Sequence, residues 1–162
     1  MTTPMDTEET TVRKVVTVDA PIERAFAVFT AGFDTWWPRT HHIAETEMTE
    51  AIIEGRAGGR WYERGVDGSE CEWGTVLAFD APNHLALSWN LDGEFHYDPD
   101  PAHTSRVDVW FTAESPARTR VELAHSQLDH HGENWRQLRD GVASDGGWPV
   151  LIDGYAEAVA AG

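Results

Sequence analysis

Residues 105–127 read SRVDVWFTAESPARTRVELAHSQ and carry the clearest structural pattern in the sequence. Within it, the residues that share one face at period two are Val107, Val109 and Phe111, then Val121, Leu123 and His125. Alternation on both sides of a short turn, here ESPAR, is typical of an antiparallel hairpin that buries one face. The stretch therefore predicts two paired strands, at 105–112 and 119–127.

The same kind of pattern extends toward the N-terminus. Five further stretches rich in β-branched and aromatic residues predict strands at 12–18, 46–54, 59–64, 71–79 and 85–91. Between residues 46 and 127, the strands are separated by segments rich in Gly, Pro, Asn and Asp, most of them short. Such short connections favour antiparallel pairing, because parallel strands need long crossovers.

Helical periodicity occurs at three places outside these strands. The segments 19–32 (DAPIERAFAVFTAG) and 33–37 (FDTWW) predict two short helices between the first and second strands. The segment 146–161 (GGWPVLIDGYAEAVAA) predicts a long C-terminal helix with an apolar stripe. We therefore expect an α+β fold, with a curved antiparallel sheet of about seven strands wrapped around that helix.

Composition restricts the classes of function. The net charge of −16 disfavours nucleic-acid and membrane-surface partners, because both carry negative charge. There is no run of 18 apolar residues and no signal-peptide pattern near the start, so we expect a cytoplasmic protein. We expect residues 1–10 to form a disordered tail and residues 11–162 to form a single domain.

Several stretches, in this order and spacing, carry a resemblance to a known family. They read VTVDAPIERAFAVFT, FDTWWP, GGRWYER, DGSECEWGTVLAFDAPNHLALSWN, VDVWFTAE, TRVELAHSQL and GWPVLIDGYA, and cover most of residues 12–160. The chain resembles the SRPBCC (START-like, helix-grip) superfamily. Within it, the chain is similar to the short bacterial form of the group named for activators of the ninety-kilodalton heat-shock-protein ATPase.

The resemblance implies a tunnel for a hydrophobic molecule between the sheet and the C-terminal helix. We therefore predict binding of a small hydrophobic ligand, with an enzyme of the polyketide cyclase/dehydratase type as the alternative. A third alternative is a chaperone-interaction module. The eukaryotic activators carry an additional N-terminal domain without a counterpart in these 162 residues, so we rank this alternative below ligand binding. If the chain assembles, we expect a homodimer.

Strand parity and the helix stripe identify a candidate lining for the cavity. The predicted ligand-binding residues are Trp37, Trp61, Trp73, Leu87, Trp89, Val109, Phe111, Leu123, His125, Trp148, Leu151, Ile152 and Tyr155. Eight tryptophans in so short a chain are consistent with a lined pocket, although tryptophan also fills ordinary cores. Trp37 is interpreted either as part of an aromatic gate at the cavity mouth or as a residue that caps the core.

Two titratable residues have two interpretations each. His125 is either a buried core residue or a polar anchor and proton donor for the ligand. Glu63 is a solvated carboxylate if it points outward. If it points inward among aromatic residues, it becomes a candidate acid, because burial raises the pKa of a carboxyl. His125 and Glu63 are thus the candidate catalytic residues.

We expect no metal and no cofactor. The pairs His41–His42 and His130–His131 are adjacent in the chain, which is poor geometry for one ion, and no zinc motif occurs. The single Cys71 excludes an intrachain disulfide and a cysteine-based zinc cluster, and no nucleophile motif surrounds it.

Overall fold

The computed structural model describes residues 10–42, 45–94 and 96–161. The predicted tail lies outside these residues except for Thr10, which is buried. The strands are β1 (Val12–Val18), β2 (Met48–Ile53), β3 (Arg60–Gly65), β4 (Glu70–Asp80), β5 (His84–Trp89), β6 (Ser105–Ser115) and β7 (Arg118–Ser126). The helices are α1 (Ile22–Phe29), α2 (Phe33–Trp36), α3 (Trp135–Ala143) and α4 (Trp148–Ala161), with a 3-10 turn η1 (Leu128–His131).

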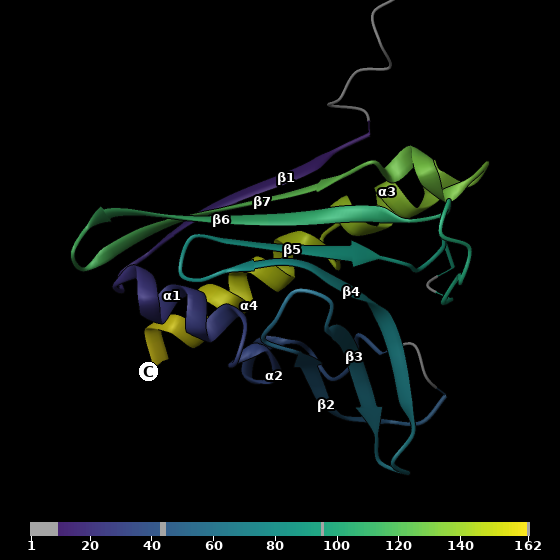
Figure 1. The fold of residues 1–162 in the computed structure, drawn as a ribbon, viewed down its shortest axis with the longest axis horizontal. Helices are drawn as coiled ribbons and strands as arrows, with labels where there is room; N and C mark the ends of the chain where they lie inside the picture. The colour runs from purple at the N-terminus through teal and green to yellow at the C-terminus, as the bar shows by residue number, and fades with distance from the viewer. Residues whose placement is uncertain (1–9, 43–44, 95, 162) are drawn as a thin grey trace, which may run out of the picture.

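The seven strands form one antiparallel sheet in the order β1-β7-β6-β5-β4-β3-β2. The long strand β4 belongs to both parts of this sheet, because residues 70–75 pair with β3 and residues 76–80 pair with β5. Figure 1 shows β2 and β3 running at a steep angle to β5, β6 and β7, with the bend in β4. The predicted antiparallel sheet is confirmed.

Helices α1, α2 and α4 share one side of the sheet (Figure 1). At one end of this interior, Phe26 and Phe29 of α1 meet Phe111 of β6 with ring centroids 5.1 and 5.8 Å apart. Tyr155 of α4 packs 5.1 Å from Phe29 and donates its hydroxyl to the carbonyl of Ala25 at 2.7 Å. The helix-grip prediction is therefore confirmed, and an aromatic cluster fills this end of the grip.

Helix α3 and the turn η1 are not among the predicted elements. Trp135, Leu138 and Val142 of α3 are buried at helical spacing, so an apolar face does exist. Gly141 and three charged residues within nine positions weaken the helical signal, because glycine disfavours a helix interior. In the structure, α3 and its connection to α4 extend the helical layer over one end of the sheet.

A close crossing of backbone and side chain joins the two parts of the sheet. The indole of Trp61 reaches across β4 and donates to the carbonyl of Ser88 on β5 at 2.7 Å. It passes directly over Gly74, where an added Cβ would collide with the Ser88 carbonyl and with the Trp61 nitrogen. The ladder between β3 and β4 shifts its register at Trp61/Tyr62, next to this crossing. Gly74 is required because only hydrogen fits between these groups.

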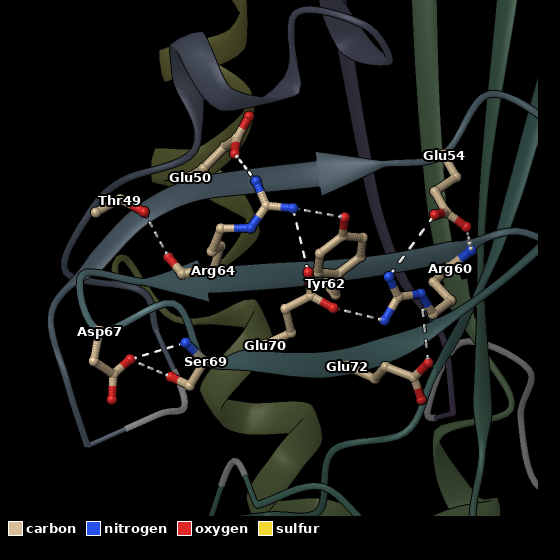
Figure 2. A network of polar contacts seen from close by, with 10 residues as sticks. All are labelled: Thr49, Glu50, Glu54, Arg60, Tyr62, Arg64, Asp67, Ser69, Glu70 and Glu72. Carbon is tan, nitrogen blue, oxygen red and sulfur yellow. Dashed lines mark hydrogen bonds and ion pairs between the residues drawn. The ribbon is translucent and has the colours of Figure 1, made fainter.

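The outer face of β2, β3 and β4 is charged. Figure 2 shows Arg64 between Glu50 and Glu70, at 2.6 and 3.2 Å, and Arg60 bonded to Glu70 at 3.2 Å. The Arg60 guanidinium also lies 4.0 Å from the ring centroid of Tyr62. Because side chains alternate along a strand, the residues on either side of Tyr62 face the interior.

We expect Gly74→Ala to lower the free energy of unfolding by roughly 2–4 kcal/mol, since the methyl group overpacks the crossing and displaces the Trp61 hydrogen bond. Urea unfolding measures the loss. The control is Gly146→Ala, whose added Cβ meets no atom within 4 Å and should change the stability by less than about 0.5 kcal/mol. Equal stabilities of the two variants would show that the crossing is not under steric constraint.

Candidate ligand-binding site

A cavity of about 360 Å³ lies between the inner face of the sheet and the two C-terminal helices. Three parts of the chain enclose it: the loop after α2, the connection from α3 to α4, and the tryptophans of β4, β5 and α4. Its lining consists of Trp37, Thr40, His41, His42, Trp73, Trp89, Gly141, Val142, Ser144, Gly146, Gly147, Trp148 and Leu151. The site is therefore concave and largely apolar, which is typical of small-molecule sites.

Four tryptophans form much of this wall, and they pack mainly edge to face. The ring centroids of Trp37 and Trp73 are 5.3 Å apart, and those of Trp73 and Trp89 are 5.5 Å apart, both at nearly right angles. Trp148 lies 5.9 Å from Trp89 and 6.5 Å from Trp37. Rings packed in this way present flat apolar faces and edges to a ligand at little entropic cost, because each is fixed by its neighbours.

Hydrogen bonds fix the orientation of three of the four rings. The indole nitrogen of Trp37 donates to the carbonyl of His41 at 3.0 Å, and that of Trp73 donates to Oε1 of Glu63 at 2.9 Å. The indole nitrogen of Trp148 donates to Nδ1 of His125 at 3.1 Å. The indole nitrogen of Trp89 is buried and has no partner among the described residues.

The hydrogen bond from Trp148 is the first of a series of hydrogen bonds that runs behind the four tryptophans. An indole N–H only donates, so Nδ1 of His125 accepts and its Nε2 carries the proton. Nε2 then donates to the Ser105 hydroxyl at 2.7 Å, and this hydroxyl donates to Nε2 of His131 at 2.7 Å. This series fixes both histidines in one tautomer each and ties α4 to β7, β6 and η1.

The two histidines in this series of hydrogen bonds, His125 and His131, are neutral at pH 7. Burial and, to a smaller extent, the neighbouring His131 lower the pKa of His125 to about 3. Burial also lowers the pKa of His131 to about 4, partly opposed by the carboxylate of Asp98. Neutral rings are what the hydrogen-bond directions require, since a protonated His125 could not accept from Trp148.

The mouth of the cavity is formed by two loops, of which the sequence predicted only Trp37, at the start of the first loop, as part of the site. Nε2 of His41 donates to the carbonyl of Gly146 at 2.7 Å, which connects the loop after α2 to the α3–α4 connection. Gly147 belongs here because an added Cβ would collide with the Val142 carbonyl. Residues such as Thr40 and Ser144 lie in irregular segments, where no periodic pattern marks a buried face.

The predicted lining residues separate into two groups. Five of them border the cavity: Trp37, Trp73, Trp89, Trp148 and Leu151. The others are buried around it or in the phenylalanine-rich end of the interior: Trp61, Leu87, Val109, Phe111, Leu123, His125, Ile152 and Tyr155. Trp37 borders the cavity and its ring is also part of the buried core, so its role as a gate stays a prediction.

The two candidate catalytic residues are both buried. Glu63 is 1 % exposed on the inner face of β3, which decides between its two orientations, and its Oε1 accepts from Trp73. His125 is fully buried behind Trp148 with both ring nitrogens hydrogen-bonded. Burial, followed by the charges of Glu63 and Asp67, raises the pKa of the Cys71 thiol, so this thiol is a poor nucleophile.

The part of the chain that the structure describes lacks two features, a metal-binding cluster and a membrane-spanning helix. Its side chains contain no group of three or more His, Cys, Asp or Glu arranged to hold a metal ion. None of its helices combines the length and the apolar character needed to span a bilayer.

A curved sheet gripping a C-terminal helix, with a tryptophan-lined cavity at one end, defines the chain as a helix-grip protein. The sequence matches the family described as "Activator of Hsp90 ATPase homolog 1-like protein" over residues 19–160. The chain belongs to this family. No curated protein matches it.

Several solved structures are similar to the chain. An anthrahydroquino-gamma-pyrone synthase is 35% identical, with 91% of this chain and 96% of that chain covered and a TM-score of 0.64. The self-sacrificing resistance protein CalC from Micromonospora echinospora is 30% identical, with 93% and 94% covered and a TM-score of 0.68. A protein from Nitrosomonas europaea, 15% identical with 98% and 99% covered and a TM-score of 0.65, shares the fold.

The two neutral histidines predict that the protein loses stability in acid. Their pKa values are near 6.5 when unfolded and lie at about 3 and about 4 when folded. As the pH falls below 6.5, the unfolded chain takes up protons that the folded chain does not. Each histidine should therefore lower the free energy of unfolding by about 2 kcal/mol between pH 7.5 and pH 5.0. Urea unfolding at the two pH values measures the sum.

His131→Gln serves as the comparison, because glutamine keeps an acceptor for Ser105 but does not titrate. We expect about half of the acid-induced loss to disappear in this variant. The comparison also removes the contribution of His103, whose pKa is raised by its hydrogen bond to Asp98 and which acts in the opposite direction. An unchanged loss in His131→Gln would mean that His131 titrates normally in the folded protein.

Proposed function

We propose that this protein binds a small, largely apolar aromatic molecule in the tryptophan-lined cavity. The observation that carries the proposal is the wall itself, because four indole rings border one cavity of about 360 Å³. Volumes of about 300–1,000 Å³ are usual for small-molecule sites, and this one lies at the lower end. The ligand is therefore a compact molecule of a few rings, held mainly by apolar burial at roughly 25 cal/mol per Å².

The arrangement of polar groups supports binding of an apolar molecule. The carboxylate of Glu63 and the imidazole of His125 are both turned to indole nitrogens of the wall. The polar side chains that border the cavity lie at the mouth, in Thr40, His41, His42 and Ser144. A ligand would therefore place its apolar body among the tryptophans and its polar substituents toward the mouth.

The names of the similar structures add a second line of support. The 35% identical protein is a synthase whose name describes a fused aromatic pyrone, and the 30% identical one is a resistance protein. Each name describes the function of the similar protein that bears it. For this chain they favour a polycyclic aromatic compound over a flexible lipid, in agreement with the flat indole surfaces of the wall.

A ring-forming enzyme of the polyketide cyclase type is the second candidate, because the 35% identical structure is a synthase. The titratable side chains that border the cavity are His41 and His42, whereas His125 and Glu63 lie behind the indoles. An acid or base for such a reaction would therefore come from the mouth. Product formation from an aromatic polyketone, lost in the double variant His41→Ala, His42→Ala, would support this candidate.

Binding is tested with N-phenyl-1-naphthylamine, a neutral aromatic probe whose emission rises in apolar sites. We expect saturable binding with quenching of tryptophan emission. Ser144→Trp, at an exposed position that borders the cavity, should weaken binding by about tenfold or more, because the new ring occupies the mouth. Native mass spectrometry of the freshly purified protein would detect a ligand carried from the cell.

The matched control is Ala143→Trp, which places the same ring at the neighbouring exposed position outside the lining. We expect this variant to bind the probe as the unaltered protein does. Equal weakening in both variants would show only a general effect of the added ring. Probe binding that neither variant changes would place the probe elsewhere and contradict the proposed site.

A further inference from the structure

Two buried side-chain nitrogens lack a hydrogen-bond partner among the described residues: Nδ1 of His131 and Nε1 of Trp89. The first lies in η1, outside the lining of the cavity. The second belongs to a ring that borders the cavity and is 2 % exposed. A buried donor without an acceptor is rare in folded proteins and is costly, so the donor of Trp89 requires an explanation.

The described rings around Trp89 supply no acceptor to its indole nitrogen. Its ring packs against Trp61, Trp73 and Trp148, with centroids 5.7, 5.5 and 5.9 Å away, and the indole nitrogens of these rings are donors only. The nearest imidazole, His125 at 4.9 Å, already uses both nitrogens. Because the Trp89 ring borders the cavity, a bound ligand can approach this ring without displacing packed side chains.

We propose that Trp89 is the specificity-determining residue of the site and that the ligand is an aromatic compound carrying a carbonyl oxygen, which accepts from Nε1 of Trp89. This inference rests on the proposed function and narrows it to a chemical class. This contact requires the Trp89 ring, which borders the cavity, to turn so that its nitrogen edge faces the ligand. An aromatic hydrocarbon of the same shape leaves this donor unpaired and therefore binds more weakly.

The test uses fluorenone and fluorene, two planar three-ring compounds of nearly equal shape. They differ by a carbonyl group in place of a methylene group. We expect the unaltered protein to bind fluorenone about tenfold more tightly than fluorene in calorimetric titrations. Trp89→Phe keeps an aromatic surface and removes the donor, so it should bind the two compounds equally. Trp110→Phe, at a partly exposed ring stacked on His84, is the control and should keep the tenfold preference.

A second measurement does not depend on the folding of a variant. In proton–nitrogen correlation spectra of the unaltered protein, the indole signal of Trp89 should shift downfield with fluorenone and much less with fluorene. The signal is assigned in the unaltered protein by the through-space contacts of the Trp89 ring with the rings of Trp61, Trp73 and Trp148.

The outcomes separate this inference from the proposed function. Equal affinities in the unaltered protein, or a preference that survives Trp89→Phe, would overturn the role of Trp89 and leave the binding site standing. Failure of both compounds and of the naphthylamine probe to bind would overturn the site and this inference together.

Discussion

The constraint on which this structure depends is that every buried indole brings an N–H group that needs an acceptor. Trp61 uses the Ser88 carbonyl and thereby joins β3 to β5 across a glycine. Trp148 uses His125, which ties the C-terminal helix to the sheet. Trp73 uses Glu63, which accounts for a carboxylate in the interior. The polar residues behind the cavity wall thus hold the wall in place, whatever ligand it meets.

The sequence indicated the architecture well, because its strands alternate clearly and its turns are short. The hairpin of β6 and β7, for example, follows directly from the period-two pattern around ESPAR. Helix α3 was missed because its apolar face rests on three residues, and Gly141 and neighbouring charges obscure the pattern. The missed helix matters, since its C-terminal end forms part of the cavity mouth.

The candidate site was predictable only in part. Parity and helical spacing indicate which side chains point inward, and Trp73, Trp89 and Trp148 were found in this way. They do not indicate which part of the interior is packed and which is hollow, because that depends on how large rings fit against one another. Around Phe111 the rings fill the space, whereas the tryptophans at the other end leave a cavity. The loop residues at its mouth have no periodicity to reveal them.

The hydrogen bond from His41 to Gly146 has a kinetic consequence. It joins two loops whose bonded residues lie 105 positions apart in the chain, and both loops border the cavity, so a ligand of the proposed site would pass between them. A bond that is intact in both the empty and the occupied protein raises the barriers to association and dissociation by the same amount. At about 1 kcal/mol, it slows each process roughly fivefold without changing the equilibrium constant. The mouth would therefore change how fast a ligand exchanges without changing its affinity, whereas the indole wall would change the affinity and, with it, the residence time.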